Sequence, residues 1–141
     1  MNYEATDSHK APALNVIVAA SKQLPAPGKA RVAWRIENMD SSQVRIEETW
    51  LPHGQFRAER QLYVPPLALP GLSSLILERE VNFAAVTAGA IENAFLILRV
   101  HYREAEWRIF VRVRAEVALS DEINPIVESI TASPVSPSPE V

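Results

Sequence analysis

The chain has 141 residues, of which 48% are hydrophobic and 22% charged, and its net charge is −3. This length predicts one globular domain, and the slightly acidic balance argues against nucleic acid as a partner. No apolar run approaches the ~20 residues that span a bilayer, so we expect no membrane insertion. The absence of cysteine excludes disulfides, thiolate metal sites and cysteine nucleophiles.

The first residues are polar, carry charges of both signs and show no signal-peptide pattern, which leaves the localisation open. We expect residues 1–12 to form a flexible N-terminal arm. Beyond this arm, apolar and polar residues alternate. Val32, Trp34 and Ile36, for example, are separated by Ala33 and Arg35 and bounded by polar neighbours. A period of two residues is typical of strands that bury one face and expose the other.

The alternation predicts seven strands separated by turn residues, at residues 13–20, 30–38, 43–50, 56–63, 73–82, 93–102 and 107–118. All four glycines of the protein, Gly28, Gly54, Gly71 and Gly89, fall in the gaps between these strands. Seven short strands with turn signals about every 8–12 residues are typical of two packed antiparallel sheets. We therefore predict an all-β fold, an immunoglobulin-like sandwich, over residues 13–120.

The last two strands are expected to form a long hairpin. If Tyr102 faces Trp107 across a loop at 103–106, Val100 lies opposite Ile109 and one face of the hairpin is entirely apolar. The other face then mixes arginines with phenylalanines, and Arg99 lies opposite Phe110. The residues of this outward face form a candidate partner surface: Phe95, Ile97, Arg99, Arg108, Phe110, Arg112 and Arg114.

The pattern changes after Leu119. Asn124 and Pro125 suit the first positions of a short helix, whereas Ile126, Glu128 and Ile130 alternate as an edge strand would. Both alternatives remain open for residues 121–130. Residues 131–141 carry several prolines and serines, and this composition predicts an extended tail without a core of its own.

Residues that carry chemistry are scattered. The motifs for an activated serine and for phosphate binding are absent, and His9, His53 and His101 are widely separated. Adjacent Glu47 and Glu48 should point to opposite faces of a strand. We therefore expect no catalytic residue, no bound metal and no cofactor, and hence no enzyme.

A second candidate site is the loop that follows the third strand. Trp50, His53 and Phe56 flank a Pro-Gly bend and could bind a small ligand or a carbohydrate by stacking and hydrogen bonding. The structural alternative is that Trp50 ends a core strand, Phe56 opens the next one and His53 is exposed between them.

The outward face of the final hairpin also has two interpretations. Arginine and phenylalanine are enriched in interfaces, and exposed apolar side chains need cover, which indicates a protein partner or self-association. Alternatively, Arg45 and Glu47 complete a network of cross-strand ion pairs that satisfies the face internally. The sequence favours neither interpretation.

The stretch Val32–Asn38, followed by Ser41–Ile46, resembles bacterial immunoglobulin-like and fibronectin-type domains, in which a strand ends at an Asn turn and small polar residues precede the next. The cysteine pair of antibody-type domains is missing, so Trp34 is not assigned the core role it has there. The resemblance implies a domain that binds, spaces or assembles. Our leading expectation is a non-catalytic interaction or assembly module, with ligand binding as the alternative.

Overall fold

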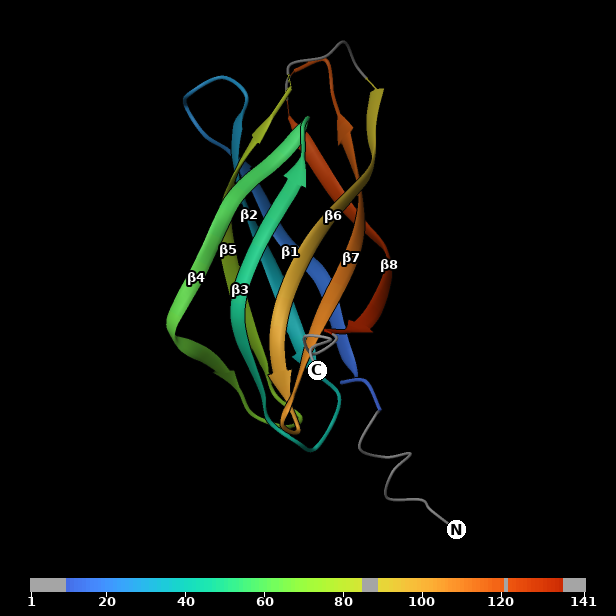
Figure 1. The fold of residues 1–141 in the computed structure, drawn as a ribbon. Coiled ribbons are helices and arrows are strands. Elements are labelled where there is room, and N and C mark those ends of the chain that lie inside the picture. Colours follow the sequence, from blue (N-terminus) through green and yellow to red (C-terminus); the bar gives the residue numbers. More distant parts are fainter. Residues whose placement is uncertain (1–9, 85–88, 121, 136–141) are drawn as a thin grey trace, which may run out of the picture.

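A computed structural model describes residues 10–84, 89–120 and 122–135, and over these residues the chain is all-β without a helix (Figure 1). The eight strands are β1 (Leu14–Gln23), β2 (Lys29–Asn38), β3 (Val44–His53), β4 (Phe56–Leu69), β5 (Ser74–Phe83), β6 (Gly89–Tyr102), β7 (Ala105–Val117) and β8 (Ile123–Pro134). The described part of the chain contains no helix that could cross a membrane.

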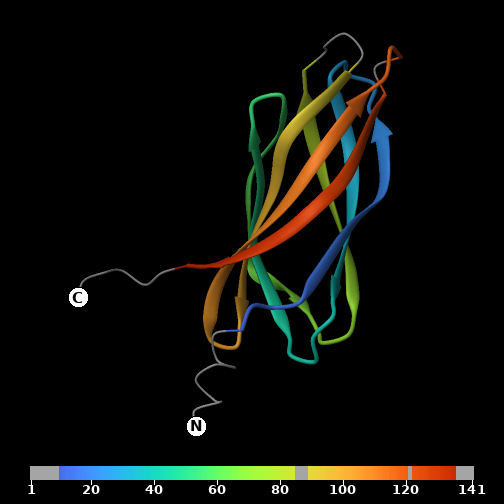
Figure 2. The ribbon, with the colours of Figure 1, turned by 90° about the vertical axis from the view of Figure 1, so that its right-hand side faces the viewer.

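The strands form one antiparallel sheet in the order β1-β2-β5-β4-β3-β6-β7-β8, which curves until it nearly closes into a barrel (Figures 1 and 2). Two seams in this sheet are weak. β4 and β5 pair only through Phe56–Phe83 and Arg57–Asn82. β1 and β8 lie side by side, linked by the Ser21 hydroxyl, which donates to the Ile123 carbonyl at 3.1 Å. The prediction of an all-β fold is confirmed. The structure has eight strands in one sheet, however, whereas the sequence predicted seven strands in two packed sheets.

The core fills the interior of this sheet, and the period-two alternation is the reason. Ala30, Val32, Trp34 and Ile36 of β2 are all completely buried, and alternate residues of the other strands meet them. The neighbouring strands β6 and β7 contribute the largest continuous rows of apolar side chains to this core. Burying each large apolar side chain of these rows stabilises the fold by about 1.5–3 kcal/mol.

The segment after residue 120 is a strand, so the helical alternative for residues 121–130 is wrong. Asn124 and Pro125 pair with Glu116 and Ala115 of β7. The free edge of β7 supplies a complete row of backbone partners, and these outweigh a local helix cap. β8 runs on to Pro134 and includes the start of the segment expected to be a tail; residues 136–141 lie outside the described part.

The final hairpin forms with the predicted faces but with a register shifted by two residues. Tyr102 pairs with Ala105, not Trp107, and Val100 pairs with Trp107. The turn consists of Arg103 and Glu104 alone, both in the left-handed region (φ 51° and 64°), as a tight two-residue turn requires. A shift of two residues preserves the faces, but it changes every cross-strand neighbour.

The same end of the sheet also holds two other turns, which contact each other: the turn after β2 and the turn before β5. The buried Asn38 amide donates to the carbonyls of Ser42, Leu69 and Pro70 at 2.8, 3.2 and 3.3 Å. A Cβ on Gly71 would lie 2.1 Å from the Ser41 carbonyl oxygen. Only glycine therefore allows the turn before β5 to approach the turn after β2.

Candidate functional site

A row of large side chains crosses the outward face of the central strands. Trp50 of β3 lies opposite Ile97 of β6, Ile97 lies opposite Phe110 of β7, and Phe110 lies opposite Thr131 of β8. We call Trp50, Ile97 and Phe110, together with Phe95, the outer row. All four belong to the two sequence-predicted sites, because Trp50 comes from the ligand loop and the others come from the partner surface. The structure brings these separate predictions onto one face.

The outer row is only partly accessible. Trp50, Phe95 and Phe110 are half-buried, and Ile97 is 9% exposed although it lies outside the core cluster. The rings of Phe95 and Phe110 meet edge to face, with centroids 6.3 Å apart and planes at 87°. The shifted register places Phe110 beside Ile97 and Arg99 beside Arg108. The Arg99–Phe110 cross-strand pair expected from the sequence is therefore not formed.

Most arginines of the predicted partner surface already have acidic partners. Arg112 pairs with Glu128 at 3.5 Å, and Arg114 contacts Glu92 at 3.0 Å and Glu116 at 2.7 Å. The Glu92 hydrogen bond raises the pKa of the Arg114 guanidinium. Arg108 is exposed and makes no ion pair with the residues that the structure describes. These arginines therefore border the outer row as paired charges, apart from Arg108.

A cluster of titratable groups lies at one end of the outer row. The His101 Nδ1 is 2.8 Å from the Glu106 carboxylate, and Arg99 Nε is 3.3 Å from Glu106 and 3.7 Å from Glu47. Burial and the neighbouring Glu106 carboxylate raise the pKa of Glu47 to about 7. Burial alone would also raise the pKa of Glu106, but hydrogen bonds from Glu47, His101 and Arg99 outweigh it and lower that pKa.

Donor atoms of Glu47, His101 and Glu106 all lie within 4.8 Å of one another, the spacing of metal ligands. The sequence did not predict this grouping, because the residues come from three strands. The Arg99 guanidinium contacts both carboxylates and already supplies the positive charge that a bound cation would supply. The cluster is thus a satisfied charge network, and the Glu47–Arg99 pair is the cross-strand contact that the internal alternative anticipated.

The residues of the predicted ligand loop do not act together. The Phe56 ring is completely buried in the core. The Gln55 backbone N–H donates to His53 Nδ1 at 3.0 Å, so His53 closes the turn between β3 and β4. The guanidinium of Arg60 lies over the Trp50 ring at 4.2 Å and pairs with the buried Glu48 at 3.0 Å. Trp50 therefore belongs with the outer row.

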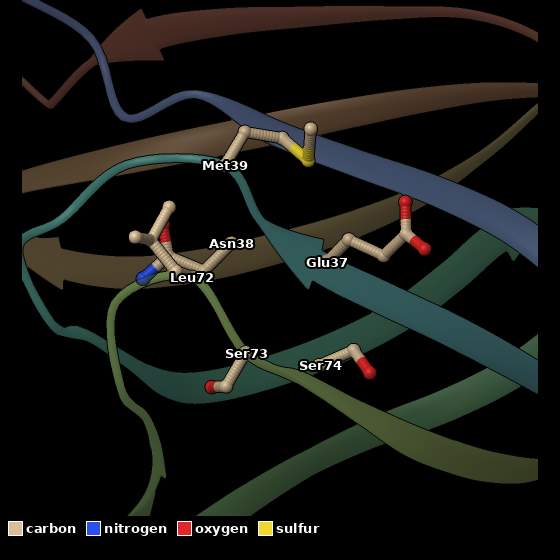
Figure 3. Close-up of a pocket in the computed structure, with 6 residues that line it drawn as sticks. All are labelled: Glu37, Asn38, Met39, Leu72, Ser73 and Ser74. Carbon is tan, nitrogen blue, oxygen red and sulfur yellow. The ribbon is translucent and has the colours of Figure 1, made fainter.

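A hollow of about 310 Å³ lies elsewhere, where the turn after β2 meets the turn before β5. Figure 3 shows the lining residue Met39 on one turn and Leu72 and Ser73 on the other. The polar groups here are already engaged: Glu37 accepts from the Asn15 amide at 2.9 Å, and the Ser73 hydroxyl donates to the Pro70 carbonyl at 2.6 Å. Few polar groups remain to orient a ligand.

Sequence reasoning missed the most exposed apolar side chains near this hollow. Met39 is 60% and Leu72 is 74% exposed, and Ile17 and Ile76 lie in one row on the outward face of β1, β2 and β5. The sequence did contain a pattern that indicates apolar side chains on the outward face of these strands. The runs Val16-Ile17-Val18 and Leu75-Ile76-Leu77 are apolar on both strand faces, which half-buried strands usually avoid.

No protein-family model, no curated protein and no solved structure matches this chain. The fold and the described surface define an all-β protein with a partly apolar, arginine-bordered outward face on its central strands.

Proposed function

We propose that this chain is a non-catalytic interaction or assembly module that binds a protein partner, or another copy, through the outward face of β3, β6 and β7. The outer row is the observation that carries this proposal. Trp50, Ile97 and Phe110 are aligned across three strands in consecutive registers. Aromatic residues and arginine supply most of the binding energy in protein interfaces, typically as a central apolar group with polar neighbours.

The charge pattern around the outer row supports a directional contact. Arg108, exposed and without an acidic partner in the described chain, can donate to a partner's carboxylate or carbonyl groups. The other arginines keep their flanking glutamates, so binding need not leave them unpaired. Interfaces of this composition gain affinity from the apolar centre and orientation from the charged border.

We also propose an immunoglobulin-like origin for the fold. The weak β4–β5 seam divides the sheet into β1-β2-β5 and β4-β3-β6-β7-β8. In immunoglobulin-type sandwiches the first, second and fifth strands share one sheet, and the third pairs with the sixth and seventh in the other. β4 corresponds to the extra strand that variable-type domains add beside the third. Domains of this type mostly serve recognition and assembly, which agrees with the proposed role.

The alternative, a small-ligand or carbohydrate site at the loop after β3, has less support. Arg60 covers a face of the Trp50 indole, His53 is used by the turn and Phe56 is buried. A stacking site needs an open aromatic face and free polar groups beside it.

The test is Phe110→Ser, compared with Ile76→Ser on the opposite outward face. Both changes replace an apolar side chain with serine, and Ile76 is 50% exposed. We expect Phe110→Ser to weaken self-association, or the capture of a specific protein from the source organism's lysate, by about tenfold or more. Sedimentation velocity and quantitative capture measure this, with melting curves to confirm folding. Equal behaviour of both folded variants and the wild type would refute the proposed surface.

A further inference from the structure

The sheet has four incompletely paired strand edges, and three of them carry features that discourage further pairing. The free part of β4 contains Pro65 and Pro66, which lack a backbone N–H, and β5 carries the charged sequence Glu78-Arg79-Glu80. β1 has an irregular register between Val18 and Ala20. The end of β1 that contains Ser21 lies against the start of β8. Prolines, charges and bulges are the usual means by which edge strands avoid pairing with other chains.

The part of β8 that follows its own irregularity at Glu128, residues 129–133, lacks these features. Between Ile126 and Ser133 there is no proline, lysine or arginine, and the single acidic residue, Glu128, is paired with Arg112 at 3.5 Å. In the described chain the ladder of β8 is formed with β7 alone. The segment includes the strand-favouring residues Ile126, Val127, Ile130 and Thr131. Its backbone donors and acceptors on the outer side are therefore available to another strand.

The C-terminal half of β8 adds little to the core. Every residue from Glu128 to Pro134 is exposed except the half-buried Ile130. Figure 2 shows this end of the strand projecting beyond the body of the sheet and away from β1. A strand end that packs only Ile130 against the core is geometrically free to accept a neighbour on its outer edge.

We propose that β8 pairs antiparallel with β8 of a second copy, so that the sheets β4-β3-β6-β7-β8 of two chains join edge to edge. Two-fold pairing of identical strands is self-complementary, and the residues from Ser129 to Ser133 are all uncharged. An axis near Thr131 places Ser129 opposite Ser133 of the second copy. The two Glu128 side chains then lie about 20 Å apart along the strands, and no like charges meet.

This pairing deepens the proposed assembly role and rests on it. Thr131 continues the outer row from Phe110, so the junction would align the two outer rows on one continuous face. The partner of this edge is thus a second copy of the chain, and the joined face is presented to whatever the module binds.

The first test is Thr131→Lys in the full chain, with Ser74→Lys on exposed β5 as the matched control. Lysines at the axis would face each other, and like charges directly opposite destabilise a strand pair. We expect sedimentation velocity to show a wild-type dimer whose Kd rises about tenfold or more in Thr131→Lys and stays unchanged in Ser74→Lys. Amide hydrogen exchange from 128 to 134 should slow as the wild-type concentration rises.

A cysteine scan gives an independent readout, because the chain has no cysteine of its own. Single Ser129→Cys, Thr131→Cys and Ser133→Cys variants are oxidised, and directly opposed strand positions lie within disulfide range. We expect efficient disulfide dimers from Thr131→Cys, and from the mixture of Ser129→Cys with Ser133→Cys. Equal cross-linking of every variant would overturn the two-fold register.

Other outcomes of these experiments also test the proposed β8 pairing. A wild type that is monomeric at every concentration overturns the proposal, as do assemblies larger than dimers. Protection of 128–134 that does not change with concentration means that the chain itself covers this edge, which also overturns it. A dimer that resists Thr131→Lys but dissociates with Phe110→Ser would refute β8 pairing and support the outward face. A dimer that dissociates with Thr131→Lys but resists Phe110→Ser would support β8 pairing and refute self-association through the outward face.

Discussion

At the scale of single residues, Tyr102 and Asp40 form a polar contact that links two elements far apart in the sequence. The Tyr102 hydroxyl at the end of β6 donates to the carboxylate of Asp40 in the turn after β2. Asp40 also accepts from the Ser42 backbone N–H at 3.1 Å. The Tyr102 hydrogen bond lowers the pKa of Asp40, whereas burial and the nearby carboxylate raise the pKa of Tyr102 to about 12. The contact therefore makes stability depend on pH at both extremes.

We predict that Tyr102→Phe is less stable than the wild type by about 2 kcal/mol at neutral pH, and that this difference disappears at high pH. The folded pKa of Tyr102 exceeds its ordinary value of 10.0, so the stabilisation is present below pH 10 and is lost as the pH rises towards 12. The pKa of Asp40 is lowered on folding, so the opposite pH dependence holds for this group. Its contribution to stability is lost as the pH falls below the ordinary value of 3.8. Urea unfolding of both proteins across pH measures the difference. A difference that stays constant to pH 12 would contradict the assignment.

At the scale of elements, the hairpin of β6 and β7 shows how a turn decides the partners of a strand. Arg103 and Glu104 both adopt positive φ, a conformation that costs a non-glycine residue about 1–3 kcal/mol. The apolar ladder on the inner face, including Leu98–Ile109 and Leu96–Val111, offsets this cost. The turn is thus imposed by the strands and is locally strained.

We predict that Glu104→Gly stabilises the protein by about 0.5–1 kcal/mol, because glycine adopts positive φ without steric cost. Glu78→Gly is the matched control. Glu78 is an exposed residue in the middle of β5 with ordinary backbone angles, so this change should destabilise the protein by about 1 kcal/mol. Thermal melting of both variants measures the difference. A lower melting temperature for Glu104→Gly would show that the turn is unstrained.

At the scale of the whole molecule, Arg79 joins the two halves of the sheet across the weak β4–β5 seam. Its guanidinium donates to the Thr49 hydroxyl at 2.8 Å, to the Thr49 carbonyl at 3.1 Å and to the Glu59 carbonyl. The side chain is 7% exposed, and burial lowers its pKa. Beyond the two backbone pairs at Phe56 and Arg57, Arg79 links β5 to the Glu59 carbonyl of β4 and to Thr49 of β3.

We predict that Arg79→Met lowers the free energy of unfolding by about 2–4 kcal/mol, because methionine fills the space but leaves buried carbonyl groups without donors. Arg35→Met, on the exposed outward face of β2, should change it by less than about 0.5 kcal/mol. Chemical denaturation measures both variants, and hydrogen exchange in β4 should accelerate in Arg79→Met alone. A seam as stable in Arg79→Met as in the wild type would mean that the guanidinium is dispensable.

Alternation along the chain was enough to predict the strands and their faces, because the two-residue period is a local property of extended backbone. It placed Val100 and Ile109 on the apolar face of the final hairpin, and both are buried in the core. It also placed Phe95, Phe110 and the arginines outward. Strand β8 could be proposed only as one of two alternatives, since a free edge on β7 decides between strand and helix.

Other features depend on which distant strands become neighbours, and only the tertiary structure decided these. The register of the last hairpin depends on strain in a two-residue turn, balanced against the whole apolar ladder. Trp50 joins Phe110 because β3 pairs with β6, and Glu47 meets Glu106 for the same reason. Arg79 lies on the inward face of β5 between the buried Leu77 and Val81, and the gap between β4 and β5 gives its guanidinium the carbonyl partners there. Local periodicity determines which way a side chain points, whereas the pairing of strands far apart in sequence determines what it meets.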